Sequence, residues 1–98
     1  MEVTLQYFDD CPSWRITGQR LRAALASAGH SEPISYVRVE TDEDAERLQF
    51  HGSPTILVDG RDPFETSGLT VGLSCRVYRT PAGLAGSPTY EQIVAVIG

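Results

Sequence analysis

An apolar strand runs directly into a helix start in one short stretch of the chain, Tyr7-Phe8-Asp9-Asp10-Cys11-Pro12-Ser13-Trp14. Pro12 suits the first helical position, because the backbone N–H that proline lacks would have no partner there. Cys11 is then the N-cap and faces the free backbone N–H groups of the first turn. Those groups and the helix dipole favour a thiolate over a thiol. The stretch therefore predicts a reactive cysteine at the start of a helix.

Length and composition predict one acidic domain. The 98 residues fit a single domain over 1–98, and the net charge of −5 includes eight basic residues, all of them Arg. No basic stripe for nucleic acid or for an acidic membrane surface is present. The first residues lack a signal-peptide pattern, and no apolar run approaches the length needed to span a membrane. We therefore expect a cytoplasmic protein, in which two cysteines are more often thiols or redox groups than a structural disulfide.

Segments with a strand-type pattern of apolar residues alternate along the chain with segments of helical spacing, and they predict the order βαβαββα. Alternating or continuous apolar runs predict strands, and 3.6-residue spacing together with capping boxes at Thr41/Asp44 and Thr89/Gln92 predicts helices. A long loop is expected over 60–72. The predicted strands cover residues 3–8, 34–39, 55–58 and 73–79, and the predicted helices cover 12–28, 42–49 and the residues after Thr89.

This element order, with Cys11-Pro12-Ser13-Trp14 at the first turn and Ser53-Pro54-Thr55 before the third strand, resembles the minimal thioredoxin fold. The resemblance implies an α/β domain with a four-stranded mixed sheet, ordered two-one-three-four and flanked by helices. In that family the first Cys attacks, and a cis-proline loop offers backbone hydrogen bonds to an extended substrate. By resemblance, attack falls on Cys11 and substrate binding on Ser53, Pro54 and Thr55. A cis Ser53-Pro54 bond is expected, since proline lowers the cis penalty to roughly 0.5 to 1 kcal/mol.

The sequence departs from that family at Trp14, which stands where a second active-site Cys would be. A Cys-x-x-Cys pair therefore cannot resolve a mixed disulfide in this chain. The chain is most similar to monothiol glutaredoxin-like proteins, which use an external thiol. The Gly-Gly-x-Asp signature by which glutaredoxins hold glutathione is replaced by residues 83–87. The resemblance implies a low-molecular-weight thiol or a protein disulfide as partner, and no cofactor.

Cys75 is the only other thiol, and it has two interpretations. It resolves Cys11 if the two Cα atoms come within about 7 Å of each other. Alternatively, it is a small apolar residue packed in a strand.

Asp10 and Trp14 flank the expected site. Carboxylates at Asp9 and Asp10 disfavour a second negative charge on Cys11, and one of them could move a proton to or from sulfur. Alternatively, they help to cap the helix. Trp14 is either a substrate platform or a packing residue on the helix face that it shares with Gly18.

Three functions follow. The leading hypothesis is a thiol-disulfide or thiol-transfer oxidoreductase that acts through Cys11. The second is a thioredoxin-like binding or adaptor module without turnover. The third is soft-metal or organomercurial handling by Cys11, Cys75 and Asp10. The two His and two Cys lack the paired spacing of a zinc site, so no metal site is predicted. The sequence does not predict an oligomeric state.

Overall fold

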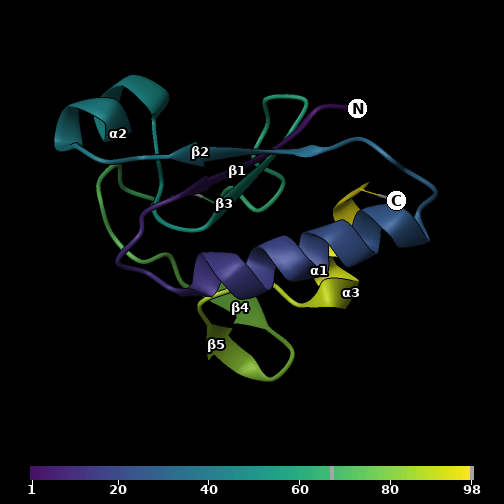
Figure 1. The fold of residues 1–98 in the computed structure, drawn as a ribbon. Helices are drawn as coiled ribbons and strands as arrows, with labels where there is room; N and C mark the ends of the chain where they lie inside the picture. Colours follow the sequence, from purple (N-terminus) through teal and green to yellow (C-terminus); the bar gives the residue numbers. More distant parts are fainter. Residues whose placement is uncertain (67, 98) are drawn as a thin grey trace.

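A computed structural model describes residues 1–66 and 68–97 of the chain; Ser67, which belongs to the predicted loop 60–72, and Gly98 lie outside the described residues. Three helices and five strands follow one another along these residues (Figure 1). In chain order they are β1 Val3–Tyr7, α1 Ser13–Ser27, β2 Ile34–Arg38, α2 Asp42–Leu48, β3 Thr55–Val58, β4 Tyr78–Thr80, β5 Gly83–Ala85 and α3 Tyr90–Ile97.

The central sheet has three strands in the order β2-β1-β3. β1 runs parallel to β2 and antiparallel to β3, with Leu5 opposite Tyr36 on one side and Ile56 on the other. Val3 and Leu5 are two residues apart, so their side chains share one face of the sheet. Both are buried.

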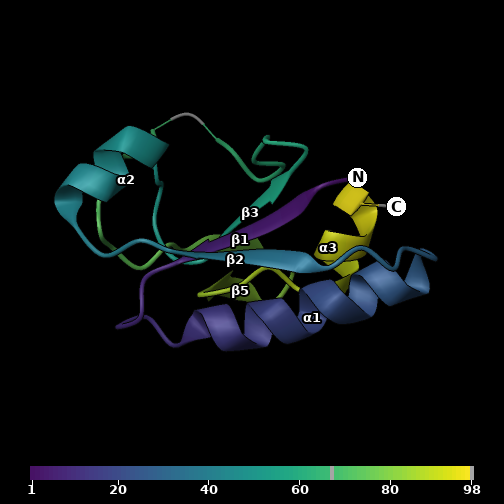
Figure 2. The ribbon, with the colours of Figure 1, turned by 45° about the horizontal axis from the view of Figure 1, so that its top comes forward.

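α1 and α3 cover that face together (Figure 2). The main core joins the sheet to both helices, because apolar side chains recur along each helix at helical spacing. Its buried members are Val3, Leu5, Leu21, Ala24, Leu25, Ile56, Ile93 and Ile97. This packing fixes the start of α1 beside the end of β1, where the candidate site lies.

A second, smaller core lies around α2, and its buried members are Val39, Ala45 and Phe50. The Thr41 hydroxyl accepts from the Asp44 N–H at 3.0 Å, as the capping pattern predicts. Phe8, Val71 and Leu73 pack against this core. The second core therefore holds the segment that precedes Cys11 and the segment that precedes Cys75.

The predicted four-stranded sheet is wrong. β4 does not extend the central sheet and instead pairs with β5, with Thr80 opposite Gly83 across a tight turn. The backbone of Val58 at the end of β3 exchanges both hydrogen bonds with Arg61 of its own turn, at 2.8 and 3.0 Å. At this end of β3 the backbone groups are therefore already bonded and do not pair with a further strand.

The expected strand over 73–79 is accordingly shorter, and only its end belongs to β4. Its first part bonds to a residue that precedes β3, since Ser53 N–H donates to the Ser74 carbonyl and Arg76 N–H donates to the Ser53 carbonyl.

The first helix begins one residue later than expected. Pro12 is its N-cap and Ser13 its first residue, so Cys11 precedes the cap. The helix ends at Ser27, one residue before its predicted end, with Ala28 as C-cap and Gly29 at φ +79° after it. Within residues 1–66 and 68–97, no helix has the length and apolarity needed to cross a membrane.

Candidate redox site

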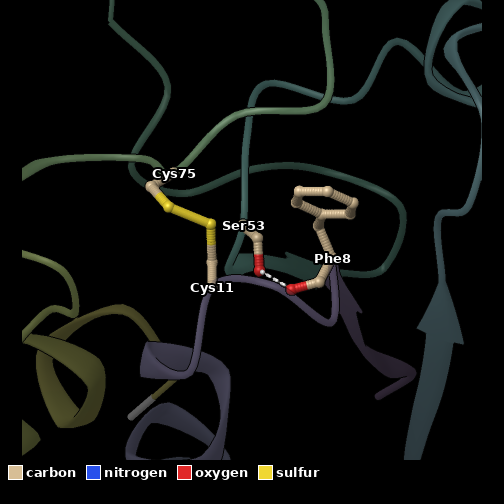
Figure 3. Close-up of a disulfide and its surroundings, with 4 residues drawn as sticks. All are labelled: Phe8, Cys11, Ser53 and Cys75. Carbon is tan, nitrogen blue, oxygen red and sulfur yellow. Dashed lines mark hydrogen bonds between the residues drawn. A yellow bond between two sulfur atoms is a disulfide. The ribbon is translucent and has the colours of Figure 1, made fainter.

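The two cysteines are joined by a disulfide (Figure 3). Their Cα atoms are 5.7 Å apart, within the limit that a resolving role requires. The sulfurs connect the turn before α1 to the segment before β4, across 64 residues of sequence. The structure therefore brings Cys11 together with Cys75, for which a packed strand residue was the alternative interpretation.

A tight turn places Cys11. Its backbone N–H donates to the Phe8 carbonyl at 3.0 Å, with Asp9 and Asp10 at the two central positions. Pro12 then caps α1, so Cys11 lies immediately before the backbone N–H groups that have no partner within the helix. The dipole of a 15-residue helix stabilises negative charge at this end.

Ser53 places Cys75. Its backbone N–H donates to the Ser74 carbonyl at 2.8 Å, and its carbonyl accepts from the Arg76 N–H at 2.9 Å, so that Ser53 and Cys75 form a single parallel bridge. The Ser53 hydroxyl donates to the Phe8 carbonyl at 3.5 Å (Figure 3). One buried residue thus ties together the two segments that carry the sulfurs.

The Ser53-Pro54 bond is cis, as expected. The backbone groups of Ser53 that the resemblance assigns to an extended substrate are bonded to the chain's own residues 74 and 76. Thr55 is also buried, and its hydroxyl donates to the Gly52 carbonyl at 2.6 Å. In the oxidised domain these backbone groups of Ser53 are therefore already bonded, and substrate binding by this loop stays a prediction.

Arg76 anchors the segment from the side opposite Cys75. Its guanidinium is 2% exposed and forms an ion pair at 2.6 Å with Asp62, whose carboxylate is 8% exposed. It also donates to the Phe64 carbonyl at 2.8 Å and to the Thr55 hydroxyl at 3.3 Å. A buried charge is tolerated when a counter-charge and further hydrogen bonds satisfy it.

Tyr78 extends this anchor. Its ring lies 4.6 Å from the Arg76 guanidinium carbon, and its hydroxyl donates to the Pro54 carbonyl. Burial raises the pKa of Tyr78 well above its usual range, although the Arg76 charge lowers it in part. The hydroxyl therefore remains a neutral donor to the cis-proline loop.

The anchor was missed because the sequence has no local signal for it. In Cys75-Arg76-Val77-Tyr78 the apolar residues Cys75 and Val77 alternate with Arg76, a pattern that favours an exposed arginine. The structure has the opposite arrangement, with Arg76 and Tyr78 buried and Cys75 and Val77 exposed. Asp62 lies in the loop whose role the sequence left open.

The two cysteines differ in their access to solvent. Cys11 is 3% exposed, whereas Cys75 belongs to the exposed residues, with exposed neighbours at Ser74 and Val77. Of the two residues that share the disulfide, Cys75 therefore presents more surface to a reagent in solution.

The carboxylates next to Cys11 face solvent. Asp9 pairs with Arg38 at 2.9 Å, in an ion pair whose two side chains are 44% and 52% exposed. Asp10 is exposed as well. Its proposed proton transfer stays a prediction.

Trp14 packs against strand residues. Its ring stacks on Tyr7 with centroids 4.2 Å apart, meets Tyr36 edge-on at 6.1 Å, and carries Arg15 on its face at 5.2 Å. These contacts agree with the interpretation of Trp14 as a packing residue. A platform role for it stays a prediction.

Among the described residues, no group of three or more His, Cys, Asp or Glu side chains is placed to hold a metal ion. For the soft-metal hypothesis the ligands that remain are the two sulfurs of the site, and in the oxidised domain these are bonded to each other.

No protein family model, curated protein or solved structure matches the chain.

Proposed function

We propose that the domain is a thiol-disulfide oxidoreductase whose redox group is the Cys11–Cys75 pair. The observation that carries the proposal is the disulfide between a residue at a helix start and a residue at the surface. The pair replaces the Cys-x-x-Cys arrangement that Trp14 rules out, because the second thiol comes from a distant segment. A protein that exchanges disulfides in this way needs one accessible sulfur and one partner sulfur within bonding reach.

Non-covalent contacts support reversible use of the pair. The hydrogen bonds of Ser53 and the Arg76–Asp62 ion pair do not depend on the disulfide. They hold the segment of Cys75 beside the turn of Cys11, so the two thiols of the reduced domain lie close together and can form the bond again. A disulfide that forms and breaks during turnover is also compatible with the proposed location in the cytoplasm.

The surface next to Cys75 supports a peptide as the partner. Val77 and Leu84 are 61% and 74% exposed, and with Phe64 and Tyr78 they line a surface cavity of about 420 Å³. Apolar side chains around a partner thiol can be buried there. We therefore include peptide substrates as well as a low-molecular-weight thiol in the test.

The test is a turnover assay. We expect the oxidised domain to accelerate disulfide formation in a dithiol peptide, with oxidised glutathione as the terminal oxidant, and peptide oxidation followed by mass spectrometry. The Cys11→Ser/Cys75→Ser double variant should leave the uncatalysed rate unchanged. A wild-type rate equal to that of the double variant contradicts the proposal.

The adaptor hypothesis is the second candidate, and the span of the disulfide favours it. A bond that closes 64 residues stabilises a small domain whether or not it ever exchanges. On that hypothesis the bond resists small thiols in the native domain and there is no turnover. The same assay separates the two candidates.

A further inference from the structure

We propose that Cys75, and not Cys11, is the sulfur that exchanges with the partner, so that Cys11 is the leaving and resolving thiol. This inference rests on the proposed function and names the roles within it. It transfers to Cys75 the attacking role that the sequence assigned to Cys11.

Access decides which sulfur an external thiolate reaches. Cys11 is 3% exposed and lies between the turn at Phe8 and the first residue of α1. Cys75 is exposed, and its backbone faces Ser53 while the next side chain, Arg76, is turned into the protein. Exchange requires direct contact between the attacking sulfur and the attacked one, so the accessible sulfur is attacked.

The site also suits Cys11 as the leaving group. When a partner thiolate bonds to the sulfur of Cys75, the Cys11–Cys75 bond breaks and its electron pair remains on the sulfur of Cys11. That sulfur belongs to the residue directly before the cap of α1, where unpaired backbone N–H groups and the helix dipole stabilise a thiolate. Cys75 has no such helix end and remains bound to Ser53 through its two neighbours.

The full cycle conserves electrons and protons. A second thiolate of the partner attacks the mixed disulfide at the partner's own sulfur, which forms the partner disulfide and releases Cys75 as a thiolate. Two partner thiols are oxidised, the domain disulfide is reduced, and the two protons pass to Cys11 and Cys75. In the opposite direction Cys75 attacks a partner disulfide, and Cys11 then displaces the partner from Cys75.

A quench experiment on the wild-type domain tests the assignment. The oxidised domain is mixed with reduced glutathione, quenched in acid, alkylated with N-ethylmaleimide in denaturant, and mapped by peptide mass spectrometry. We expect glutathione on Cys75 and the alkyl group on Cys11. The reverse pattern overturns the assignment.

Two single-cysteine variants give an independent measurement. Cys11→Ser and Cys75→Ser are each treated with Ellman's reagent, and folding is checked by circular dichroism. We expect the Cys75 thiol in Cys11→Ser to react at least about ten-fold faster than the Cys11 thiol in Cys75→Ser, with the difference lost in denaturant. A faster reaction of Cys11 in the folded protein overturns the inference.

These outcomes are separable from failure of the proposed function. If glutathione bonds to Cys75 but the peptide assay shows no turnover, the oxidoreductase proposal fails while the difference in access stands. If turnover occurs with the mixed disulfide on Cys11, the assignment of roles fails and the oxidoreductase proposal stands.

Discussion

The buried guanidinium of Arg76 joins the loop at Asp62 and Phe64 to the segment of Cys75. We expect Asp62→Asn to lower the free energy of unfolding by about 3 to 5 kcal/mol, since it leaves a buried guanidinium without a counter-charge. Urea unfolding of the oxidised protein measures this change.

Asp9→Asn is the matched control, because it removes a carboxylate from an exposed pair with Arg38. A change of about 0 to 1 kcal/mol is expected there. Equal effects of the two substitutions would show that burial does not distinguish the two pairs.

At the scale of elements, Gly86 leaves room for the side chain of Ser13, the first residue of α1. A Cβ at Gly86 would lie 2.4 Å from the Ser13 hydroxyl oxygen and 3.2 Å from its Cβ. We expect Gly86→Ala to destabilise the domain by about 1 to 3 kcal/mol through overpacking at the first turn of the helix. Thermal or urea unfolding measures the loss.

Two further variants check the cause. A Cβ at Gly72 would meet no atom within 4 Å, so Gly72→Ala should stay within about 0.5 kcal/mol of the wild type. Adding Ser13→Ala to Gly86→Ala removes the nearest oxygen and should restore part of the lost stability. No recovery in the double variant would rule out the clash.

The elements that the sequence predicted well are those with local causes. The alternation at the start of the chain, the spacing of Leu21 and Leu25, and the capping residue Thr41 act within a few residues, and β1, α1 and α2 follow from them. The strand expected over 73–79 has a similar alternation, but its hydrogen bonds depend on Ser53. Pairing between distant segments leaves little trace in local periodicity.

The features of the site also divide into those with local causes and those that depend on distant segments. The turn at Cys11 and the cis bond at Pro54 could be predicted from short motifs. Short motifs left open whether Cys75 bonds to Cys11 and missed the ion pair of Arg76, because each depends on how segments 14 or 64 residues apart come together.

For the whole molecule, the disulfide closes a loop that contains most of the chain. With a sequence separation of 64 between the cysteines, restriction of the unfolded chain contributes about 4 kcal/mol. We expect reduction to lower the free energy of unfolding by about that amount and to leave the domain folded, because neither core contains Cys75 and only contacts near the bond are lost. Urea titrations with and without a phosphine reductant measure this change.

The Cys11→Ser/Cys75→Ser double variant should unfold at the same urea concentration with and without the reductant. A wild-type domain that unfolds fully on reduction would contradict a reversible redox pair and favour a structural disulfide.

The closed loop also determines how the molecule responds to tension. β1 and α3 lie outside the loop, while α1, β2, α2 and β3 lie between the bonded cysteines. A force that pulls the two ends apart can therefore strip β1 and α3 from the sheet, but it cannot lengthen the enclosed segment. A thiol that cuts the bond under load releases that segment at once. The oxidation state of one pair of sulfurs thus sets the maximum length to which the chain can be stretched.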